Sequence, residues 1–435
     1  MRKKRALVSL IAIAAILFIS TLVITFLNQK DPYRFFVGLG TNFDIAPDDG
    51  KVLISYYSNG DEAIYEADVT GENVRKLVDS EEGRLHSPKY SPDGERILFL
   101  SSDSDGINSL MIAHRDGSNQ KRLSENNMHV SEAVYSASGD TIFYTAIAEE
   151  DFKKAEGETK EGLDLYSVSI TGEDNKQLTD KNYFSMNALS ISPDGDQVYY
   201  SLYNGSREQL TSYSLETGAE GPADGSSLLP VEIYSTVISP DGTKLAYTSI
   251  AEESRNSSLF EYDLFIMDAA SGKKERMTNL NTSVIAPVFF HKENRIAFLE
   301  YTNWAGSPEK YEFMIQDVQS KKLDHVTFYM PPESKFNRSL SVISNVANGQ
   351  TAIGLYILLM ILLISYLSYF HTSRRYLPAK VNLALVGVGV VITIALTFGM
   401  NPWVGMAFGG LTAIFLGTSI VAFIFAFILG RLGKK

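Results

Sequence analysis

The sequence predicts an all-β, six-bladed propeller outside the cytoplasm, carried by four α-helical transmembrane segments. Three observations predict this fold. A turn-and-strand unit recurs six times in the middle of the chain, four long apolar stretches flank that region, and all 51 Asp and Glu lie between residues 30 and 349. Several short strands in each repeat of ~40–50 residues are typical of propeller blades.

Charge is divided by position along the 435-residue chain. Residues 1–29 and 350–435 contain no acidic residue and carry 10 of the 39 Lys and Arg, whereas residues 30–349 have a net charge of −22. A strongly acidic surface repels phosphate, so nucleic-acid binding by this region is disfavoured. The absence of cysteine excludes disulfides, zinc-thiolate sites and a thiol nucleophile.

The first apolar stretch follows a basic N-terminus, residues 1–5, and runs from Ala6 to Leu27. At ~1.5 Å per residue, it is long enough for a helix to cross a hydrocarbon core of ~30 Å. A cleaved signal peptide is the alternative, but its apolar region is usually ~7–15 residues and ends at a small-x-small site. No such site follows Leu27, so an uncleaved anchor is favoured.

Three further apolar runs lack any charged residue and span residues 352–370, 383–400 and 404–429. Lys and Arg gather at residues 1–5, in the 371–382 connection and in the 430–435 tail. Four spans place these clusters on one side of the membrane, which the positive-inside rule makes cytoplasmic. The sequence therefore predicts a multi-pass protein of a bacterial plasma membrane, with both termini cytoplasmic and the acidic region outside.

Gly405 and Gly409 form a GxxxG pattern, which permits two helices to approach closely. Packing within the chain explains this pattern at least as well as dimerisation. The four spans contain no ionisable side chain of the kind that transporters and proton relays use. We expect the helices to anchor the protein and to offer a surface for assembly.

The repeated unit is clearest in three copies, in which Ser-Pro-Asp-Gly precedes an apolar strand: Ser91–Leu100, Ser192–Tyr200 and Ser239–Tyr247. Weaker copies are Pro47–Gly50 and Ser136–Asp140, and a degenerate sixth is His291–Arg295. Proline presets φ for a turn, aspartate bonds the local backbone and glycine accepts positive φ. Each copy therefore predicts a tight turn into a β-strand.

In each unit one strand precedes the repeated turn and one follows it. A further strand, a short glycine turn and a last strand come next, so each unit has four strands. Six such blades account for residues 41–327, between linkers at 28–40 and 328–351. If residues 33–39 begin another unit, the count becomes seven.

Ser-Pro-Asp-Gly before an apolar strand resembles the repeat of the TolB-like, or PD40 (WD40-like), β-propeller family. That family also supplies the propellers of prolyl-oligopeptidase-type proteases. The resemblance implies the fold of the middle region and says little about its function, because one fold hosts many activities.

No catalytic motif accompanies the repeat. The Gly-x-Ser-x-Gly elbow of α/β-hydrolases, the Walker loop and His-Glu-x-x-His are all absent. Asp103 to Gly106 resemble the start of a calcium loop, but its twelfth position is His114 rather than Glu, so a hairpin turn is favoured. The six histidines are scattered, which does not exclude a metal in a central channel. We predict no catalytic residue, no cofactor and no metal ion.

The connection after the second strand of each blade differs in length. It is short at residues 58–62, 102–108 and 204–208, and long at 147–162, 250–261 and 302–310. The long connections carry Phe152, Phe260 and Trp304, and all six must emerge on one face of a propeller. Aromatic side chains on loops over a rigid scaffold are typical of recognition sites. The alternative is that they tuck against blade edges.

These patterns predict a non-enzymatic docking or sensing module for an envelope protein or ligand, bound through Phe152, Phe260 and Trp304. One alternative is a polysaccharide- or peptide-processing enzyme with its site in the central channel, which a cluster of His, Arg and carboxylates there would favour. Another is an accessory subunit of a membrane complex, recognised through its C-terminal helices.

Overall fold

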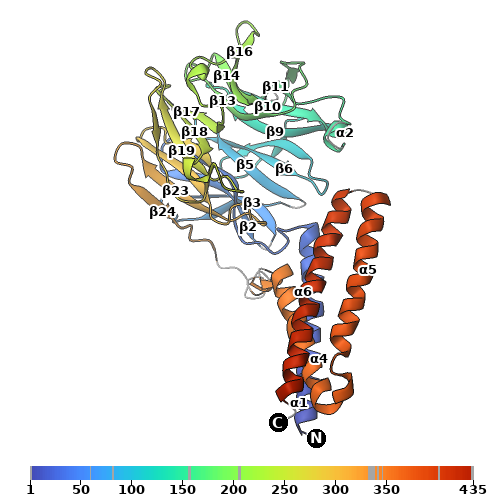
Figure 1. Ribbon diagram of the computed structural model, residues 1–435. Coiled ribbons are helices and arrows are strands. Elements are labelled where there is room, and N and C mark those ends of the chain that lie inside the picture. The colour runs from blue at the N-terminus through green and yellow to red at the C-terminus, as the bar shows by residue number, and fades with distance from the viewer. Residues whose placement is uncertain are drawn as a thin grey trace. The chain divides into compact units, whose positions relative to one another are not determined.

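The computed structural model describes residues 2–58, 60–80, 83–154, 158–203, 207–331, 339, 342–344, 346–399 and 402–432. The chain divides into two compact units (Figure 1). One is Pro32–Arg338, and the other combines Met1–Asp31 with Ser339–Lys435.

The first unit contains six four-stranded antiparallel sheets, each built from four consecutive strands in sequence order. The first three sheets are β1 (Gly38–Ile45), β2 (Lys51–Ser58), β3 (Asp61–Asp68), β4 (Arg75–Val78); β5 (Arg84–Tyr90), β6 (Arg96–Ser102), β7 (Asn108–His114), β8 (Lys121–Arg122); and β9 (Met128–Tyr135), β10 (Thr141–Ala148), β11 (Asp164–Ser169), β12 (Lys176–Gln177). The last three are β13 (Met186–Ile191), β14 (Gln197–Tyr203), β15 (Glu208–Ser214), β16 (Glu220–Pro222); β17 (Tyr234–Ile238), β18 (Lys244–Ile250), β19 (Tyr262–Asp268), β20 (Lys274–Arg276); and β21 (Ser283–Phe289), β22 (Arg295–Tyr301), β23 (Tyr311–Asp317), β24 (Leu323–Val326). The predicted six-bladed propeller is confirmed.

The Ser-Pro-Asp-Gly turn shows why each blade begins as it does. In the fifth blade, the Ser239 hydroxyl donates to the Asp241 carboxylate at 2.6 Å and accepts the Lys244 N–H at 2.9 Å. The bond from Ser239, with those from the Thr243 backbone and hydroxyl, lowers the pKa of Asp241 to about 2. Gly242 has φ +71°, a conformation that glycine adopts without strain. The motif therefore closes the hairpin with its own side chains.

The core lies between neighbouring sheets, as in a ring of stacked blades. Leu53 and Ile64 of the first sheet pack with Ile97 and Phe99 of the second. Ile54 of the first sheet packs in one cluster with residues of the sixth, which closes the ring face to face. The six blades are complete without residues 33–37, which precede β1, so the seven-bladed alternative is wrong.

Polar contacts lock the closing junction. The buried Asp49 carboxylate accepts the backbone N–H groups of His291, Lys292 and Glu293 at 2.8, 2.7 and 3.0 Å. Nearby, Gly71 has φ +88°, and a Cβ there would lie 2.2 Å from the Thr327 carbonyl oxygen. The turn of the first blade thus fits against the end of the last one only without a side chain.

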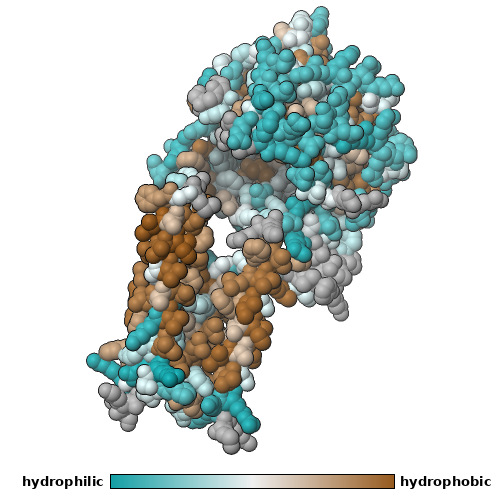
Figure 2. All heavy atoms as spheres, turned by 90° about the vertical axis from the view of Figure 1, so that its right-hand side faces the viewer, coloured by the Kyte–Doolittle hydropathy of each residue, from teal (hydrophilic) through white to brown (hydrophobic). Residues whose placement is uncertain are grey.

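The second unit contains α1 (Arg2–Lys30), α4 (Gly349–Phe370), α5 (Leu377–Gly399) and α6 (Pro402–Leu432). All four are long and apolar enough to cross a membrane, as predicted. Figure 2 shows their surface as continuous hydrophobic bands that give way to hydrophilic residues at one end. Lys4 lies 5.8 Å above the Phe370 ring, and Arg375 lies against Gly430, so basic residues from all three clusters gather at that end.

Gly405 and Gly409 both face α5 within the same chain. A Cβ at Gly405 would lie 1.9 Å from Thr397 Oγ1, and one at Gly409 would lie 3.5 Å from Thr393 Cγ2. The pattern thus brings α5 and α6 together as an antiparallel hairpin. Dimerisation through the same glycine faces would compete with this packing.

Asn382 links three helices. It lies one residue before the predicted span of residues 383–400, within α5, which begins at Leu377. The Asn382 side chain is buried and accepts the Tyr356 hydroxyl of α4 at 2.7 Å. It donates to the Thr418 hydroxyl of α6 at 2.9 Å and to the Phe415 carbonyl at 3.2 Å. Both the amide oxygen and the amide nitrogen of Asn382 thus bond to neighbouring helices, as is typical of polar residues in membrane bundles.

Candidate functional site

One end of the propeller carries all the connections between second and third strands. Neighbouring strands of each sheet are antiparallel, so the second strand ends where the first strand began. The starts of the six first strands therefore lie at this same end. We call it the loop face. The Ser-Pro-Asp-Gly turns lie at the opposite end, which we call the turn face.

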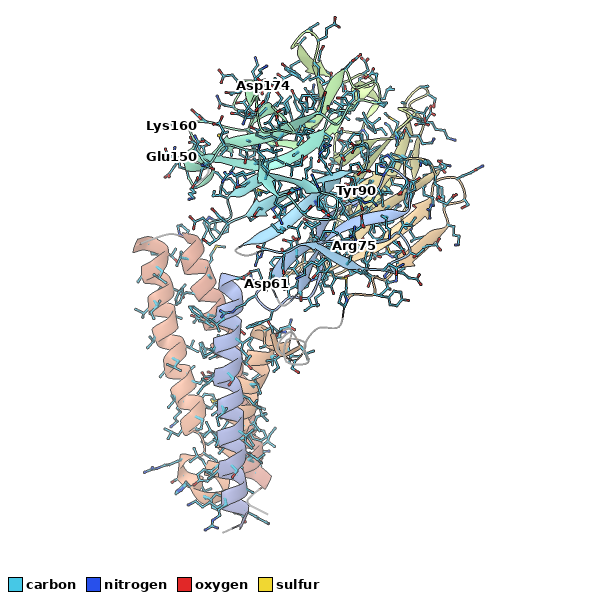
Figure 3. The ribbon with its side chains drawn as sticks, turned by 180° about the vertical axis from the view of Figure 1, so that it is seen from behind. Asp61, Arg75, Tyr90, Glu150, Lys160 and Asp174 are labelled. Carbon is cyan, nitrogen blue, oxygen red and sulfur yellow. The ribbon has the colours of Figure 1, made fainter. Side chains whose placement is uncertain are left out.

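Two of the long connections on the loop face begin with the same four residues, Ile-Ala-Glu-Glu, and form a helical turn: α2 (Glu149–Phe152) and η2 (Glu252–Ser254). Figure 3 shows Glu150 and Lys160 of the first connection at the outer rim of the propeller. The third connection is closed by Thr302 and Lys310, which share a backbone hydrogen bond of 2.9 Å.

Trp304 and Phe260 come together on the loop face. The Trp304 indole N–H donates to the Phe260 carbonyl, which joins the connections of the fifth and sixth blades. The Trp304 ring meets Tyr301 and Tyr262 edge to face, with centroids 4.9 and 5.7 Å apart. The Phe260 side chain is 44% exposed, so it is available to a partner.

Phe152 lies in a different sector, on the third blade. Its ring stacks on His129 with centroids 3.5 Å apart, while it stays 43% exposed. His129 Nδ1 accepts the Asn108 N–H at 3.2 Å, and burial with the nearby His86 lowers its pKa to about 4. The neutral imidazole thus holds Phe152 against the scaffold. The structure joins two of the three predicted aromatic residues and separates the third.

The cluster of aromatic side chains extends further than the sequence predicts, and Tyr57 and Tyr301 within it are buried. We define the aromatic band as Tyr33, Tyr57, Tyr234, Tyr262, Tyr301, Trp304 and Tyr311. Tyr301 lies 5.0 Å from Tyr311, and Tyr33 stacks on Tyr57 at 4.7 Å. The Glu309 backbone bonds the Tyr33 hydroxyl, which links the sixth blade to the segment before β1. The sequence predicts a linker over residues 28–40, and the aromatic content of Tyr33–Phe36 is the signal within it that points to this band.

Arg84 and Glu62 complete the loop face at the first two blades. The Arg84 guanidinium lies 5.1 and 5.6 Å from the Tyr33 and Tyr57 rings. The Glu62 side chain is buried, which raises the pKa of its carboxyl to about 7 although the Tyr57 hydroxyl bonds it and Arg84 attracts its charge. A carboxyl that titrates near neutrality, beside a cation and tyrosines, is chemically distinct from the solvated acids around it.

The innermost strands line the channel, and neighbouring groups hold two of their carboxylates, Glu132 and Asp44. Glu132 accepts the N–H groups of Ala188 and Leu189 at 3.1 and 2.7 Å, at a bulge where Ala188 has φ +57°. Asp44 accepts the Tyr90 N–H at 2.9 Å and pairs with Lys89 at 3.3 Å. Figure 3 shows Tyr90 between blades, where its hydroxyl donates to a buried glutamate, Glu66.

Metal ligands do not converge in the described part of the chain. Among those residues, no three His, Asp or Glu side chains are grouped so that they could hold a metal ion. The Asp103 carboxylate accepts the N–H groups of Asp105 and Ile107 at 2.8 and 2.9 Å, as in a tight hairpin turn. Asp105 pairs with Lys153 of the third blade at 3.1 Å. This segment is therefore a hairpin turn, and its ion pair with Lys153 joins the second and third blades on the loop face.

Comparison with known proteins shows which domain family the propeller is similar to. The family model of the TolB beta propeller domain (PD40) matches residues 29–222. The propeller is TolB-like. This match confirms the resemblance carried by the Ser-Pro-Asp-Gly units.

Individual relatives of this TolB-like chain are distant. A Bacillus subtilis protein described as the uncharacterized peptidase YuxL is 26% identical over 191 residues, which are 43% of this chain and 25% of that protein. This chain thus spans a quarter of that relative's length. TolB from Acinetobacter baumannii is 16% identical, with a TM-score of 0.46 over 66% of this chain and 62% of TolB. An oligogalacturonate lyase from Vibrio parahaemolyticus is 10% identical, with a TM-score of 0.49 over 66% of this chain and 93% of the lyase.

Proposed function

We propose that this protein is a membrane-anchored docking module whose TolB-like propeller binds an envelope protein outside the cytoplasm, without catalysing a reaction. The aromatic band carries this proposal. It joins side chains of the fifth, sixth and first blades on one face of a rigid ring, and Tyr234 and Phe260 at its edge are 40% and 44% exposed. Tyrosine and tryptophan dominate the binding energy of protein interfaces because they bury large areas at low entropic cost.

The channel supports docking more than chemistry. Its carboxylates Asp44 and Glu132 are held by backbone N–H groups and, at Asp44, by Lys89. A general acid or base must reach the proton that it transfers. Carboxylates engaged with the protein backbone serve the scaffold, so the observations favour the docking role over a channel enzyme.

Site-specific photo-crosslinking tests the proposal in cells that express the full chain. A photo-reactive amino acid replaces Phe260, whose backbone and not its side chain holds Trp304. The matched control replaces Glu173, an exposed residue between β11 and β12 on the turn face. We expect a discrete adduct from position 260 and none from position 173, with the partner identified by mass spectrometry.

The outcomes separate the alternatives. Equal labelling from both positions, or no adduct at position 260 with normal expression, contradicts docking through the loop face. Adducts obtained only from exposed positions of the C-terminal helices, such as Phe398, would support the accessory-subunit alternative instead.

A further inference from the structure

Three rings of the aromatic band meet nearly at right angles. Tyr262 and Trp304 are inclined by 85°, and Tyr234 and Tyr262 by 86°, with centroids 5.7 and 5.3 Å apart. In each edge-to-face pair the edge of one ring meets one face of the other, and the remaining faces point in different directions around one corner. We call Tyr234, Tyr262 and Trp304 the aromatic corner. The negative face of an aromatic ring attracts a cation placed above it, and several such faces around one point form a cation-binding cage.

The segments around the aromatic corner are acidic. Residues 207–208, 231–234, 251–262 and 300–310 together contain seven carboxylates and three basic side chains. Burial, the Tyr262 hydroxyl and the charges of Glu208 and Glu232 all raise the pKa of Tyr234, which places both glutamates near the corner. One oxygen of the Glu208 carboxylate is buried and finds no hydrogen-bond partner among the described residues. Arg255 pairs with Glu232 and Glu252, and Arg276 pairs with Glu253, yet the carboxylates still outnumber these cations, so the electrostatic environment favours a positive ligand.

Elsewhere the protein covers such rings with its own cations. Arg84 lies over Tyr33 and Tyr57 in the same aromatic band, and Arg295 lies 4.2 Å from the Phe290 ring. Within the ranges that the structure describes, no Lys or Arg lies over Tyr234, Tyr262 or Trp304. The aromatic corner thus presents rings of the same kind, at a different angle to one another, without a cation of this chain over them.

We propose that the aromatic corner binds a lysine or arginine side chain from a basic segment of the protein partner. This inference rests on the proposed docking function and specifies the chemistry of its partner. The partner's cation sits over the open faces of Tyr262 and Trp304, and Glu208 balances its charge, because Glu232 already pairs with Arg255 at 2.8 Å. The net charge of −22 on residues 30–349 draws a basic segment toward the propeller at long range.

The fluorescence of Trp304 can report the binding of a cation at the aromatic corner. The chain has two tryptophans, so Trp403→Phe leaves Trp304 as the single indole of the full-length protein in detergent. The probe is the capped peptide Gly-Arg-Gly-Arg-Gly, and the control is the same peptide with citrulline, a neutral isostere, in place of arginine. We expect saturable change in Trp304 fluorescence with the arginine peptide and little or none with the citrulline peptide.

Variants separate the corner from general attraction to an acidic protein. Tyr262→Leu should weaken arginine-peptide binding about fivefold or more, Glu208→Gln about threefold, and Tyr262→Phe little, because a phenyl face still attracts a cation. Tyr329→Leu removes an exposed aromatic residue beside the Gly71 turn, on the turn face, and should leave binding unchanged. Equal binding of the two peptides, or binding unaltered by Tyr262→Leu, overturns the inference.

This inference and the docking function can fail separately. Equal affinity for both peptides, together with a discrete adduct from position 260, removes the cation site and leaves the docking face supported. Arginine-specific binding without any adduct from position 260 supports the cation site and contradicts docking by an envelope protein.

Discussion

At Glu62, burial outweighs the favourable groups around the carboxylate. Desolvation raises the pKa to about 7, against the Tyr57 hydroxyl, Ser55 and the Arg84 charge, all of which lower it. A Cβ at Gly40 would lie 2.3 Å from Glu62 Oε1, so the backbone of β1 packs directly onto this carboxyl. The folded protein therefore binds the Glu62 proton more tightly than the unfolded chain does.

This shift makes stability depend on pH in a defined direction. Because the folded pKa lies above the unfolded value of 4.5, the stabilising contribution is complete below pH 4.5 and is lost as pH rises through 7. The stability lost between pH 4.5 and pH 7 amounts to about 3 kcal/mol. Glu62→Gln, which resembles the protonated acid, should reduce the decline in thermal stability between pH 5 and pH 8.

The matched control is Glu72→Gln, which alters an exposed carboxylate of the same blade. Thermal unfolding of the full chain in detergent, followed by circular dichroism across this pH range, measures both variants. A Glu62→Gln profile with the same slope as the unsubstituted protein would contradict the buried-acid account.

At the scale of elements, the α5–α6 hairpin depends on a missing side chain. The position of a Cβ at Gly405 falls 1.9 Å from Thr397 Oγ1 and 2.8 Å from its Cα. Gly405→Leu should therefore separate the helices and destabilise the bundle by about 1–3 kcal/mol, the usual cost of overpacking. Spin-label distances between cysteines introduced into α5 and α6 measure the separation, since the chain has no cysteine of its own.

Gly410→Leu is the control for that experiment, because a Cβ at Gly410 meets nothing within 4 Å. Both substitutions add the same side chain to the same helix, so their effects on helix propensity are similar. If the two variants show equal α5–α6 distances, the glycine contact does not set the packing of the hairpin.

At the scale of the whole propeller, one carboxylate holds the first and last blades together. Asp49 accepts three backbone N–H groups from the turn of the sixth blade. Asp49→Asn retains the shape and tolerates φ +66° at this position, but its amide N–H₂ opposes buried donors. We expect a loss of about 2 kcal/mol, seen as a fall of several degrees in the melting temperature.

Asp48→Asn provides the comparison for ring closure, because Asp48 is exposed and its carboxylate accepts only the local Gly50 N–H at 2.9 Å among the bonds described. Hydrogen exchange should show faster opening at β1 and β21 in Asp49→Asn and not in Asp48→Asn. Uniform exchange in all six blades of the Asp49 variant would argue against a specific closing contact.

The orientation across the membrane is also a whole-molecule prediction. Single cysteines at Ser118, on the turn face, and at Ser373, between α4 and α5, provide reporters in a cysteine-free chain. An impermeant thiol reagent applied to intact cells should label position 118 and spare position 373 until the membrane is permeabilised. The reverse pattern would place the propeller in the cytoplasm.

Local chemistry explains how much of this architecture could be predicted. Four uncharged apolar runs predict four helices because a bilayer core demands that length of apolar chain. Ser-Pro-Asp-Gly before an apolar strand predicts three hairpins, and its weaker copies predict three more, because the motif satisfies its own turn, as Ser239 and Asp241 show. These elements depend on residues that are close in sequence, so the sequence by itself determined the repeated hairpin and the number of apolar spans, whereas the choice between six and seven blades needed the structure.

Contacts between distant residues were decided only by the tertiary structure. Tyr33 meets the loop of Glu309, Tyr234 and Trp304 converge on Tyr262, and Asp49 reaches His291 because the ring brings blades together at angles that no local pattern encodes. The same holds for Asn382, whose partners lie on two other helices. Phe152 illustrates the converse, since it shares a loop type with Phe260 but lies on a blade that packs elsewhere in the ring. The candidate site is thus set by how the blades close, which depends on the fit of side chains across their faces.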